Sequence, residues 1–325
     1  MKLKKIKRMV AVGTAILMTL SLAGCGIGSD SVKLGAAGVG GGYYAFSNAF
    51  AQIASSENED LDFEVKATAG STANIRLLSD GYVDMAIAQA DLVDAAYNGT
   101  GATDKKRYRG YSAVASLSTE ACQIVVRSDS GIDSLDDLQG KKISVGEEES
   151  GTQRNAEQIL KMTGLVESLV DTVNLDYVDA ANELKSGQID AFFCTAGIQT
   201  SVIEELSKEC DVKLIGIDDK CRDRLKSVYG FYTDYTIPAG TYEGQTQDVV
   251  TLGVRAVLLA RDDMDEKIVE ELTGLLFEHA QDIQYSIALT FQIDESEAVK
   301  NVTIPFHDGA KAYYQKKGIE IPAEQ

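Results

Sequence analysis

Short apolar runs along the chain alternate with stretches in which apolar residues recur at helical spacing. The runs at residues 32–35, 63–68 and 85–88 suit buried strands. The stretches at 43–55, 72–78 and 92–97 between and after them suit helices. Strands that alternate with helices favour a parallel sheet that helices cover on both faces. The first hundred residues therefore predict an α/β unit.

The same alternation restarts in the middle of the chain. Strands are predicted at 142–145, 173–177 and 191–194, with helices at 152–162 and 181–185. Residues 77–87 and 183–193 look like copies of one unit, because each ends a helix at a glycine and continues through an aspartate into an apolar strand. Such joints are common in α/β folds, so coincidence is the alternative. The matching Gly-x-(Val/Ile)-Asp spacing favours two pseudo-equivalent lobes.

Two long apolar runs separate these series. Residues 112–127 read as two adjoining extended stretches, 113–117 and 122–126, and residues 249–260 form a second run. We interpret them as two connections that cross between lobes. Lobe I is then discontinuous and comprises residues 26–118 with 248–325, whereas lobe II comprises 119–247. Helices are also predicted at 265–280 and 309–316.

The N-terminus has the features of an export and anchoring signal. A cationic start that includes Lys2 and Arg8 precedes an uncharged apolar stretch, and Leu22-Ala23-Gly24-Cys25 follows. The last four residues resemble a bacterial lipobox, whose cysteine receives a diacylglycerol anchor. An uncleaved anchor and an ordinary secretory signal are the alternatives. We predict a lipoprotein signal over residues 1–25, lipidation at Cys25, and a protein held on the outer face of the cytoplasmic membrane.

Charge narrows the classes of partner. Without the signal, 26 basic and 50 acidic residues remain, a net charge of −24. Such a surface repels nucleic acid and anionic lipid, so no nucleic-acid partner is expected. The only histidines, His279 and His307, lie far apart in sequence and give no metal-ligand spacing. We expect no metal, no cofactor and no catalytic residues, since no nucleophile–base motif is present either.

Four cysteines remain besides Cys25. An exported protein can form disulfides, and Cys210 and Cys221 could close a short loop. Cys122 and Cys194 fall in predicted strands, where free thiols behave as small apolar residues. Pairing cannot be deduced from sequence, so a Cys210–Cys221 bridge and four free thiols both stay open.

Four strand ends carry residues suited to a ligand. In open parallel sheets, ligands bind beyond the carboxyl ends of the strands. A glycine-rich loop at 35–42 follows the first strand, and the segments at 69–72 and 149–152 each begin a helix whose free amides could bind an anion. The candidate ligand-binding residues are Gly40, Gly41, Tyr43, Ser71, Thr72, Gln89, Ser150, Gly151, Thr152, Arg154, Thr195 and Gly197.

The ordered motifs resemble those of TAXI-type substrate-binding proteins (TRAP-associated extracytoplasmic immunogenic) along nearly the whole mature chain. The motifs that carry the resemblance lie at 35–44, 67–78, 84–89, 126–132, 150–152, 190–193, 236–242 and 305–314. The departures are Ala36 and Val39 where the family's glycine-rich loop usually has threonines, and three glutamates at 147–149.

The resemblance implies a type II periplasmic-binding-protein-like fold, α/β and two-lobed, with mostly parallel sheets and two crossing strands. It implies a monomeric receptor, not an enzyme, that captures a small carboxylate or amino acid of the glutamate, glutamine or dicarboxylate class. The receptor would deliver this ligand to an ion-coupled TRAP permease. The binding component of an ABC importer is one alternative, and a surface sensor, an adhesin or an enzyme that uses the same cleft is another. The three acids at 147–149 face either solvent or a ligand ammonium group.

Overall fold

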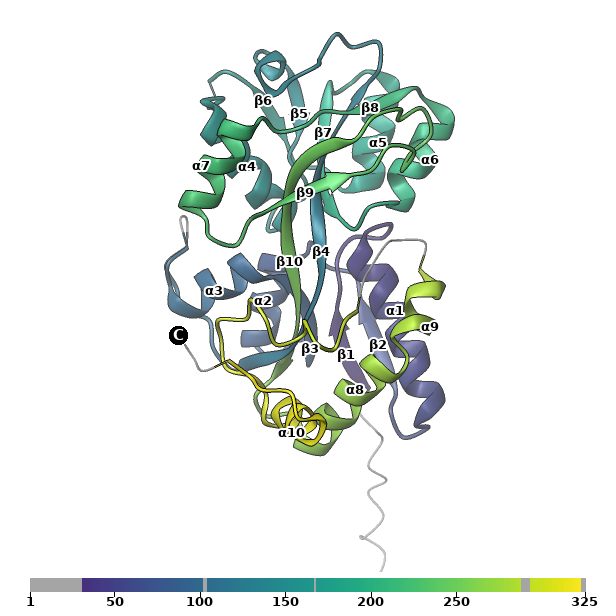
Figure 1. Ribbon diagram of the computed structural model, residues 1–325, viewed down its shortest axis with the longest axis vertical. Coiled ribbons are helices and arrows are strands. Elements are labelled where there is room, and N and C mark those ends of the chain that lie inside the picture. The colour runs from purple at the N-terminus through teal and green to yellow at the C-terminus, as the bar shows by residue number, and fades with distance from the viewer. Residues whose placement is uncertain (1–30, 102–103, 167, 288–292, 323–325) are drawn as a thin grey trace, which may run out of the picture. The chain divides into compact units, whose positions relative to one another are not determined.

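The computed structural model describes residues 31–101, 104–166, 168–287 and 293–322. These residues form an α/β structure with ten strands in one sheet (Figure 1). The strands are β1 (Val32–Gly35), β2 (Phe63–Lys66), β3 (Met85–Gln89), β4 (Tyr111–Arg127), β5 (Lys142–Ser144), β6 (Asp171–Val173), β7 (Ala191–Ala196), β8 (Val212–Leu214), β9 (Thr233–Ile237) and β10 (Val249–Arg261). The helices are α1 (Gly42–Glu57), α2 (Ser71–Ser79), α3 (Ala90–Asn98), the short 3₁₀ helix η1 (Leu135–Leu138), α4 (Gly151–Thr163), α5 (Tyr177–Ser186), α6 (Ser201–Glu209), α7 (Asp219–Val228), α8 (Glu266–Glu278), α9 (Ala280–Ser286) and α10 (Asp308–Lys317).

The sheet has parallel ends and an antiparallel middle. Its order is β2–β1–β3–β10–β4–β7–β5–β6, with β8 paired to β4 and β9 paired to β10. The β1–β3 strands pair in parallel, as do β5–β7, whereas β4 and β10 run antiparallel to each other between the two groups. We call β1–β3 with α1–α3 and α8–α10 the first lobe, and β5–β7 with α4–α7 the second lobe. The predicted two-lobed α/β fold with two crossing strands is confirmed.

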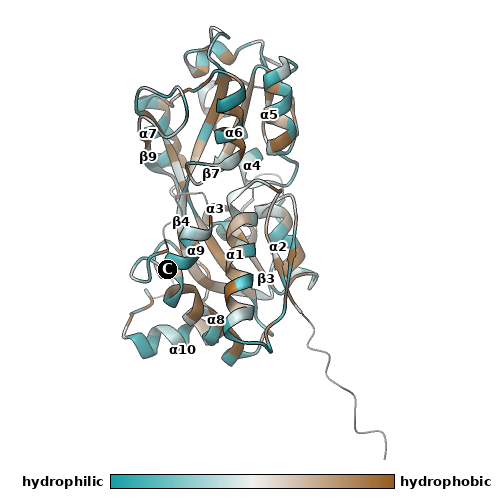
Figure 2. Cartoon of the chain, turned by 90° about the vertical axis from the view of Figure 1, so that its right-hand side faces the viewer, coloured by the Kyte–Doolittle hydropathy of each residue, from teal (hydrophilic) through white to brown (hydrophobic). Residues whose placement is uncertain are grey.

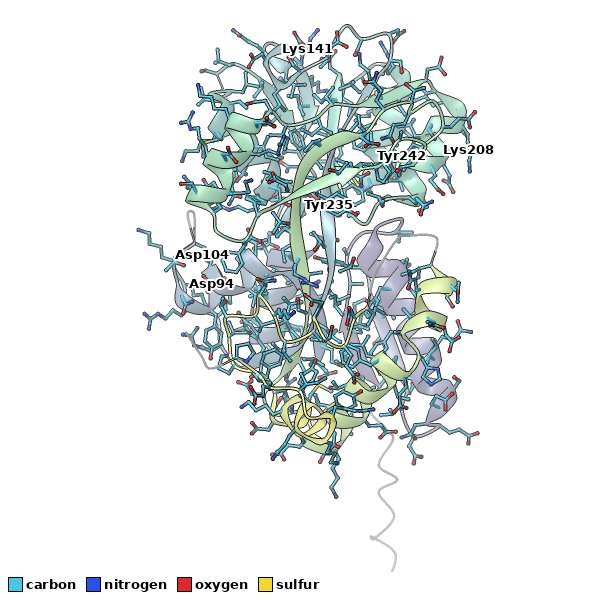
Figure 3. All side chains as sticks on the ribbon, viewed as in Figure 1. Asp94, Asp104, Lys141, Lys208, Tyr235 and Tyr242 are labelled. Carbon is cyan, nitrogen blue, oxygen red and sulfur yellow. The ribbon has the colours of Figure 1, made fainter. Side chains whose placement is uncertain are left out.

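Each lobe has its own buried core. The first core draws on residues 34–117 and 256–314, so both ends of the described chain build one lobe. In the second lobe, Phe193 packs into one cluster and its neighbour Phe192 into another. Successive strand residues point to opposite faces, so these clusters cover the two faces of the sheet. Hydrophobic residues gather along the strands, whereas hydrophilic side chains such as Asp104 and Lys208 point outward (Figures 2 and 3).

The crossing strand β4 is continuous where the sequence pattern indicates two adjoining stretches. The pattern predicts two stretches, whereas β4 runs without a break from Tyr111 to Arg127 because it pairs with β10 over most of its length. The two strands approach closely at Gly253, where an added Cβ would lie 2.5 Å from the Cγ2 atom of Thr119. A side chain at Gly253 would therefore force the two crossing strands apart.

The two similar segments predicted from sequence, residues 77–87 and 183–193, both connect a helix to a strand, one in each lobe. Gly81 and Gly187 adopt φ values of +75° and +74°, as expected of residues that follow a helix in the left-handed conformation. The Asp84 carboxylate then accepts a hydrogen bond from the Lys33 amide at 2.9 Å, and the Asp190 carboxylate accepts one from the Lys142 amide at 2.8 Å. Each aspartate thus links the start of its own strand to a neighbouring parallel strand.

Several predicted boundaries are corrected. Ser71 is the first residue of α2 rather than its N-cap, because Gly70 takes the cap position with φ +116°. The strand predicted at 173–177 ends at Val173, since the Asp176 side chain accepts from the Asp179 amide and starts α5. The helix predicted at 265–280 is divided at His279 into α8 and α9.

Of the two alternatives that the sequence left open for the cysteines, the structure has free thiols. Cys210 and Cys221 are free, as are Cys122 and Cys194. Cys221 is buried in one cluster of the second lobe, whereas Cys210 packs against the other. The two thiols therefore belong to different faces of the same sheet.

The predicted signal peptide and the lipidation site Cys25 lie outside the described residues. Across the described ranges, no helix combines the length and the apolar character that crossing a bilayer requires.

Candidate functional site

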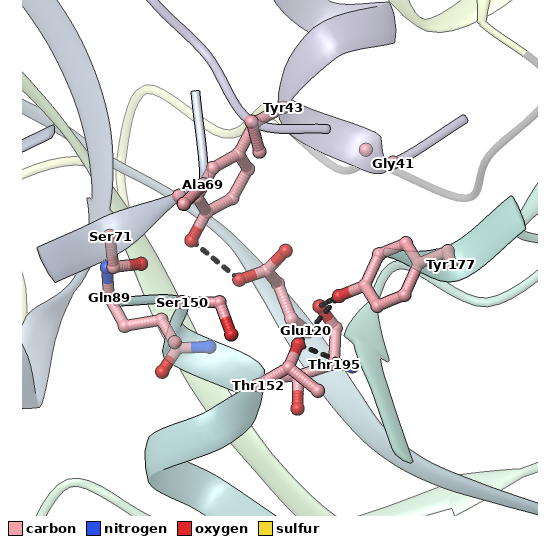
Figure 4. Close-up of a pocket in the computed structure, with 14 residues that line it drawn as sticks. Gly41, Tyr43, Ala69, Ser71, Gln89, Glu120, Ser150, Thr152, Tyr177 and Thr195 are labelled. Atoms are coloured by element: carbon pink, nitrogen blue, oxygen red, sulfur yellow. Dashed lines mark hydrogen bonds between the residues drawn. The ribbon is translucent and has the colours of Figure 1, made fainter. Parts of the chain in front are cut away.

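A small cavity opens between the two lobes, and residues from both of them line it. The first lobe contributes the starts of α1 and α2 and the end of β3. The second lobe contributes the start of α4, Tyr177 of α5 and the end of β7, while Glu120 comes from the crossing strand β4 (Figure 4). The cavity thus lies at the carboxyl ends of parallel strands, where this kind of sheet binds ligands.

The glycine-rich loop brings the start of α1 to the cavity. Gly41 is the N-cap of α1 and carries no side chain that could cap the helix. Gly41 and Tyr43 line the cavity, whereas Gly40 does not. The Gly40 carbonyl instead accepts a hydrogen bond from the Ser201 hydroxyl at 3.4 Å, which links the loop to the second lobe.

Ser71, the first residue of α2, lines the cavity. The Ser71 hydroxyl accepts from the Gln89 amide at 3.1 Å and is buried. The amides of Thr72 and Ala73 donate to the Glu149 carbonyl at 3.1 and 3.3 Å. The amides that we expected to bind a ligand therefore donate to Glu149, a residue of the second lobe.

The start of α4 is capped as predicted. The Ser150 hydroxyl accepts from the Gln153 amide at 2.9 Å, a cap that does not use the amides of Gly151 and Thr152. An added Cβ at Gly151 would lie 2.6 Å from the side-chain amide carbon of Gln89. The absence of a side chain at Gly151 thus lets the two lobes approach each other here.

Hydroxyl groups of the second lobe form one hydrogen-bonded set at the cavity. The oxygens of Thr152 and Tyr177 lie 2.6 Å apart, and the Thr195 amide donates to Thr152 Oγ1 at 3.2 Å. The Tyr177 hydroxyl also approaches the Thr195 carbonyl at 3.1 Å. Burial raises the pKa of Tyr177, so its hydroxyl is neutral and polar without charge.

Glu120 places a carboxyl group inside the cavity. Its residue is 2% exposed, and the Tyr43 hydroxyl donates to Glu120 Oε2 at 2.7 Å (Figure 4). Burial raises the pKa of Glu120 to about 8, although hydrogen bonds from Tyr43 and Gln89 act in the opposite direction. Burial also raises the pKa of Tyr43 well above its usual range.

Gln89 connects the lobes through a relay of buried side chains. Its Nε2 atom donates to Asn155 Oδ1 at 3.0 Å, and Asn155 Nδ2 donates to the Tyr232 hydroxyl at 2.8 Å. The Tyr232 hydroxyl in turn donates to Gln158 Oε1. Because Gln89 belongs to the first lobe and the other three to the second, the relay fixes the lobes in their present arrangement.

A second and larger cavity lies beside the first, also between the lobes. Arg154, Thr72 and the acids Glu148 and Glu149 line it. At its edge Arg76 forms a two-point ion pair with Glu149, at 3.2 Å from Nε to Oε1 and 2.6 Å from Nη2 to Oε2. Glu149 therefore contacts the first lobe through both its carbonyl and its carboxylate.

The structure brings together eight of the twelve residues expected from sequence around the first cavity. They are Gly41, Tyr43, Ser71, Gln89, Ser150, Gly151, Thr152 and Thr195. Thr72 and Arg154 line the second cavity, whereas Gly40 and Gly197 line neither. The Gly197 carbonyl accepts from the Thr200 hydroxyl, a contact within the loop after β7.

The sequence-based selection missed six lining residues, of which Glu120 and Tyr177 carry polar side chains and the other four are Ala37, Gly42, Ala69 and Gly70. One signal could have identified Glu120, which is the only charged residue between Tyr111 and Val126. A charge is rarely fully buried in a strand of this kind without a specific reason. Tyr177 had no comparable signal, since its segment read as the end of a strand.

The described residues contain no group of three or more His, Cys, Asp or Glu side chains that could hold a metal ion. The first cavity offers backbone amides, neutral hydroxyls, one amide side chain and one carboxyl group. Such a set can bind and orient a small polar solute.

The profile of the NMT1-like family matches residues 34–318. Among solved structures, the chain is similar to MatC from Rhodopseudomonas palustris with bound malate, at 14% identity over 82% of this chain and 91% of that one, with a TM-score of 0.57. It is also similar to a protein from Bordetella bronchiseptica RB50, at 18% identity over 90% of this chain and 83% of that one, with a TM-score of 0.54. At these identities the likeness shows a shared fold.

Proposed function

The chain belongs to the NMT1-like family, and from this premise we propose that it is an extracytoplasmic solute-binding receptor rather than an enzyme. It captures a small carboxylate or amino acid between its lobes and delivers it to a membrane permease. We take the lobes as residues 26–118 with 248–325 and residues 119–247. The observation that carries the proposal is the cavity to which both lobes contribute helix starts and strand ends.

Binding by closure follows from the position of the cavity. A ligand that touches Gly41 and Ser71 on one side and Thr152 and Thr195 on the other makes all of its contacts only when the lobes are together. Its differential affinity for that state shifts the population towards closure. Closure then creates the surface that a permease can distinguish from the unliganded receptor.

A carboxylate fits the two helix starts. The amides of Gly151 and Thr152 are not used by the Ser150 cap, and Gly41 begins α1 without a capping side chain. Free N–H groups and the positive end of the helix dipole favour an anion at such a place. The malate bound to the structurally similar MatC supports the same class of ligand.

The proposed permease is an ion-coupled TRAP transporter, on the strength of the sequence motifs that resemble TAXI proteins. An ABC importer is the second candidate, since binding components of both systems can use a two-lobed fold. Uptake in vesicles that contain the permease encoded beside this protein separates them. A TRAP system requires an ion gradient, whereas an ABC importer requires ATP.

Export and a lipid anchor at Cys25 complete the proposal. The expected mature protein begins at Cys25 and carries a diacylglycerol group, which mass spectrometry of the membrane-extracted protein measures directly. Cys25→Ser should release an unlipidated protein. A mature N-terminus elsewhere would contradict the anchor without affecting the cavity.

Calorimetry with a blocked cavity tests the binding function. Gly41→Leu adds an apolar side chain at a lining position with a φ of −89°, where the Cβ would lie 3.2 Å from the Gly38 carbonyl oxygen and 3.5 Å from the Tyr177 ring. At the control position Gly230 a Cβ meets nothing within 4 Å. A panel of small carboxylates and amino acids should contain a ligand that binds the wild type and Gly230→Leu but not Gly41→Leu. Turnover of the bound compound, or no binding and no thermal shift across the panel, would favour a sensor, an adhesin or an enzyme.

A further inference from the structure

Glu120 is a buried acid without a cationic partner. It lies on the crossing strand β4 opposite Val254 of β10, and its carboxyl group stands at the centre of the cavity view (Figure 4). None of the fourteen lining residues is a lysine, arginine or histidine. Within the described ranges Glu120 takes part in no ion pair. Without such a partner the carboxyl is mostly neutral, because burial raises its pKa to about 8, and only a cationic group from outside the chain could pair with its ionised form.

The titratable groups that face Glu120 cannot supply a positive charge. They are Tyr43 on α1, Tyr177 on α5, Cys122 on β4 and Cys194 on β7. Burial raises the pKa of all four, so they stay neutral at physiological pH. The nearby arginines, Arg76 and Arg154, line the second cavity instead.

Two hydrogen-bonding groups can stabilise the Glu120 carboxylate once it ionises. The Tyr43 hydroxyl donates to Oε2, and hydrogen bonds from Tyr43 and Gln89 both lower the pKa that burial raises. A second anion beside this carboxyl would keep it protonated, because two like charges at contact distance repel each other in a low-dielectric site. A ligand cation would instead favour the loss of the proton and attract the carboxylate that results. A positive group on the ligand therefore gains an ion pair that an anionic group cannot form.

We propose that Glu120 is the subsite for a protonated amine, so that the solute is an amino acid or another carboxylate that carries an amino group, rather than a dicarboxylate. This inference rests on the proposed binding function of the cavity. The ammonium group lies against Glu120, while the ligand carboxylate lies at the starts of α1 and α4. One cavity thus recognises both ends of a zwitterion.

Matched probes that differ only in the amino group test the inference. The pairs are L-aspartate with succinate and L-glutamate with glutarate, and calorimetry measures their affinities. In the wild type the amine-bearing member of a pair should bind at least about 100-fold more tightly. Glu120→Gln keeps an acceptor for the Tyr43 hydroxyl but removes the charge, and should weaken that ligand by about 100-fold, since loss of one partner of a buried charge pair has effects of this size. The deaminated probe should keep or gain affinity.

A proton count gives a second readout of the same subsite. At pH 7 a carboxyl with a pKa of about 8 is mostly protonated, so an ammonium ligand should displace nearly one proton per molecule bound. Calorimetry in two buffers of different ionisation enthalpy measures this release. Glu120→Gln should abolish it, whereas the surface variant Glu209→Gln should not.

The outcomes separate the two proposals. Tighter binding of succinate or glutarate than of their amino counterparts, or an equal loss for both members of a pair in Glu120→Gln, would overturn the amine subsite and leave the binding function intact. If no probe with or without an amino group binds, the proposed function fails and the inference fails with it.

Discussion

The ion pair between Arg76 and Glu149 should hold the lobes together to a degree that exchange experiments can measure. The Glu149 carboxylate contacts Arg76 at two points, and the Glu149 carbonyl accepts from the Thr72 and Ala73 amides. The two side chains are 39% and 41% exposed, which places the pair among exposed salt bridges. Such pairs contribute about 0.2–1 kcal/mol, and two-point geometry favours the upper end.

Glu149→Gln should therefore speed hydrogen exchange at Thr72 and Ala73. These amides exchange only when the lobes separate or α2 unfolds, and a loss of about 1 kcal/mol raises the open population about fivefold. Exchange followed by mass spectrometry on the peptide that contains both residues measures the rate. The increase in exchange rate that Glu149→Gln causes should become smaller between about 0.01 M and 1 M salt, because the screening length falls from about 30 Å to 3 Å.

A matched variant controls for general loss of a surface charge. Glu209→Gln breaks the ion pair with Lys185, which joins α5 to α6 inside the second lobe. It should leave exchange at Thr72 and Ala73 unchanged. Equal rates in Glu149→Gln and the wild type, or an acceleration that salt does not reduce, would refute the role of this ion pair in lobe closure.

Three further predictions concern the same region. Gly151→Ala should weaken ligand binding at least tenfold in calorimetry, because its Cβ would lie 2.6 Å from the Gln89 side chain, while Gly230→Ala should bind as the wild type does. Tyr232→Phe should lower the free energy of unfolding by about 1–3 kcal/mol in urea, because Asn155 and Gln158 lose their buried partner, and an unchanged midpoint would contradict the relay. Circular dichroism follows this unfolding, since the chain has no tryptophan. The pKa of Glu120 is about 8 in the folded protein and about 4.5 in the unfolded chain. Between these pH values the unfolded chain binds fewer protons than the folded protein, so the stability of the wild type falls as pH rises. Glu120→Gln has no carboxyl to titrate, so its free energy of unfolding relative to that of the wild type should rise by up to about 1.4 kcal/mol per pH unit from pH 5 to 8. A difference that stays constant over this range would show that Glu120 does not titrate there.

Periodicity and short spacing rules predicted most of the fold because they are local. The Gly-x-(Val/Ile)-Asp copies identified a joint that both lobes use, and Ser150 caps α4 as its position indicated. The split of β4 into two stretches was wrong because pairing with β10, more than a hundred residues away, decides its length. A local pattern carries no information on that contact.

The sequence predicted the site residues that lie at or just after the ends of strands, but it did not predict Glu120. Strand ends placed Ser71, Gln89 and Thr152 at the cavity, whereas Glu120 entered it from the middle of a long crossing strand. The amides of α2 were expected to face a ligand, but the Glu149 carbonyl from the other lobe takes them. Contacts between the lobes depend on how the two lobes pack against each other, and the local sequence pattern of either lobe does not predict this packing.

A crystal structure of the protein with the solute that it retains through purification would show which groups hold the ligand. We predict density for one small amine-bearing carboxylate enclosed by Gly41, Ser71, Thr152 and Glu120, with its nitrogen beside the Glu120 carboxylate. A solute held in the second cavity beside Arg154, or on an outer face of either lobe, would mean that the first cavity is not the binding site.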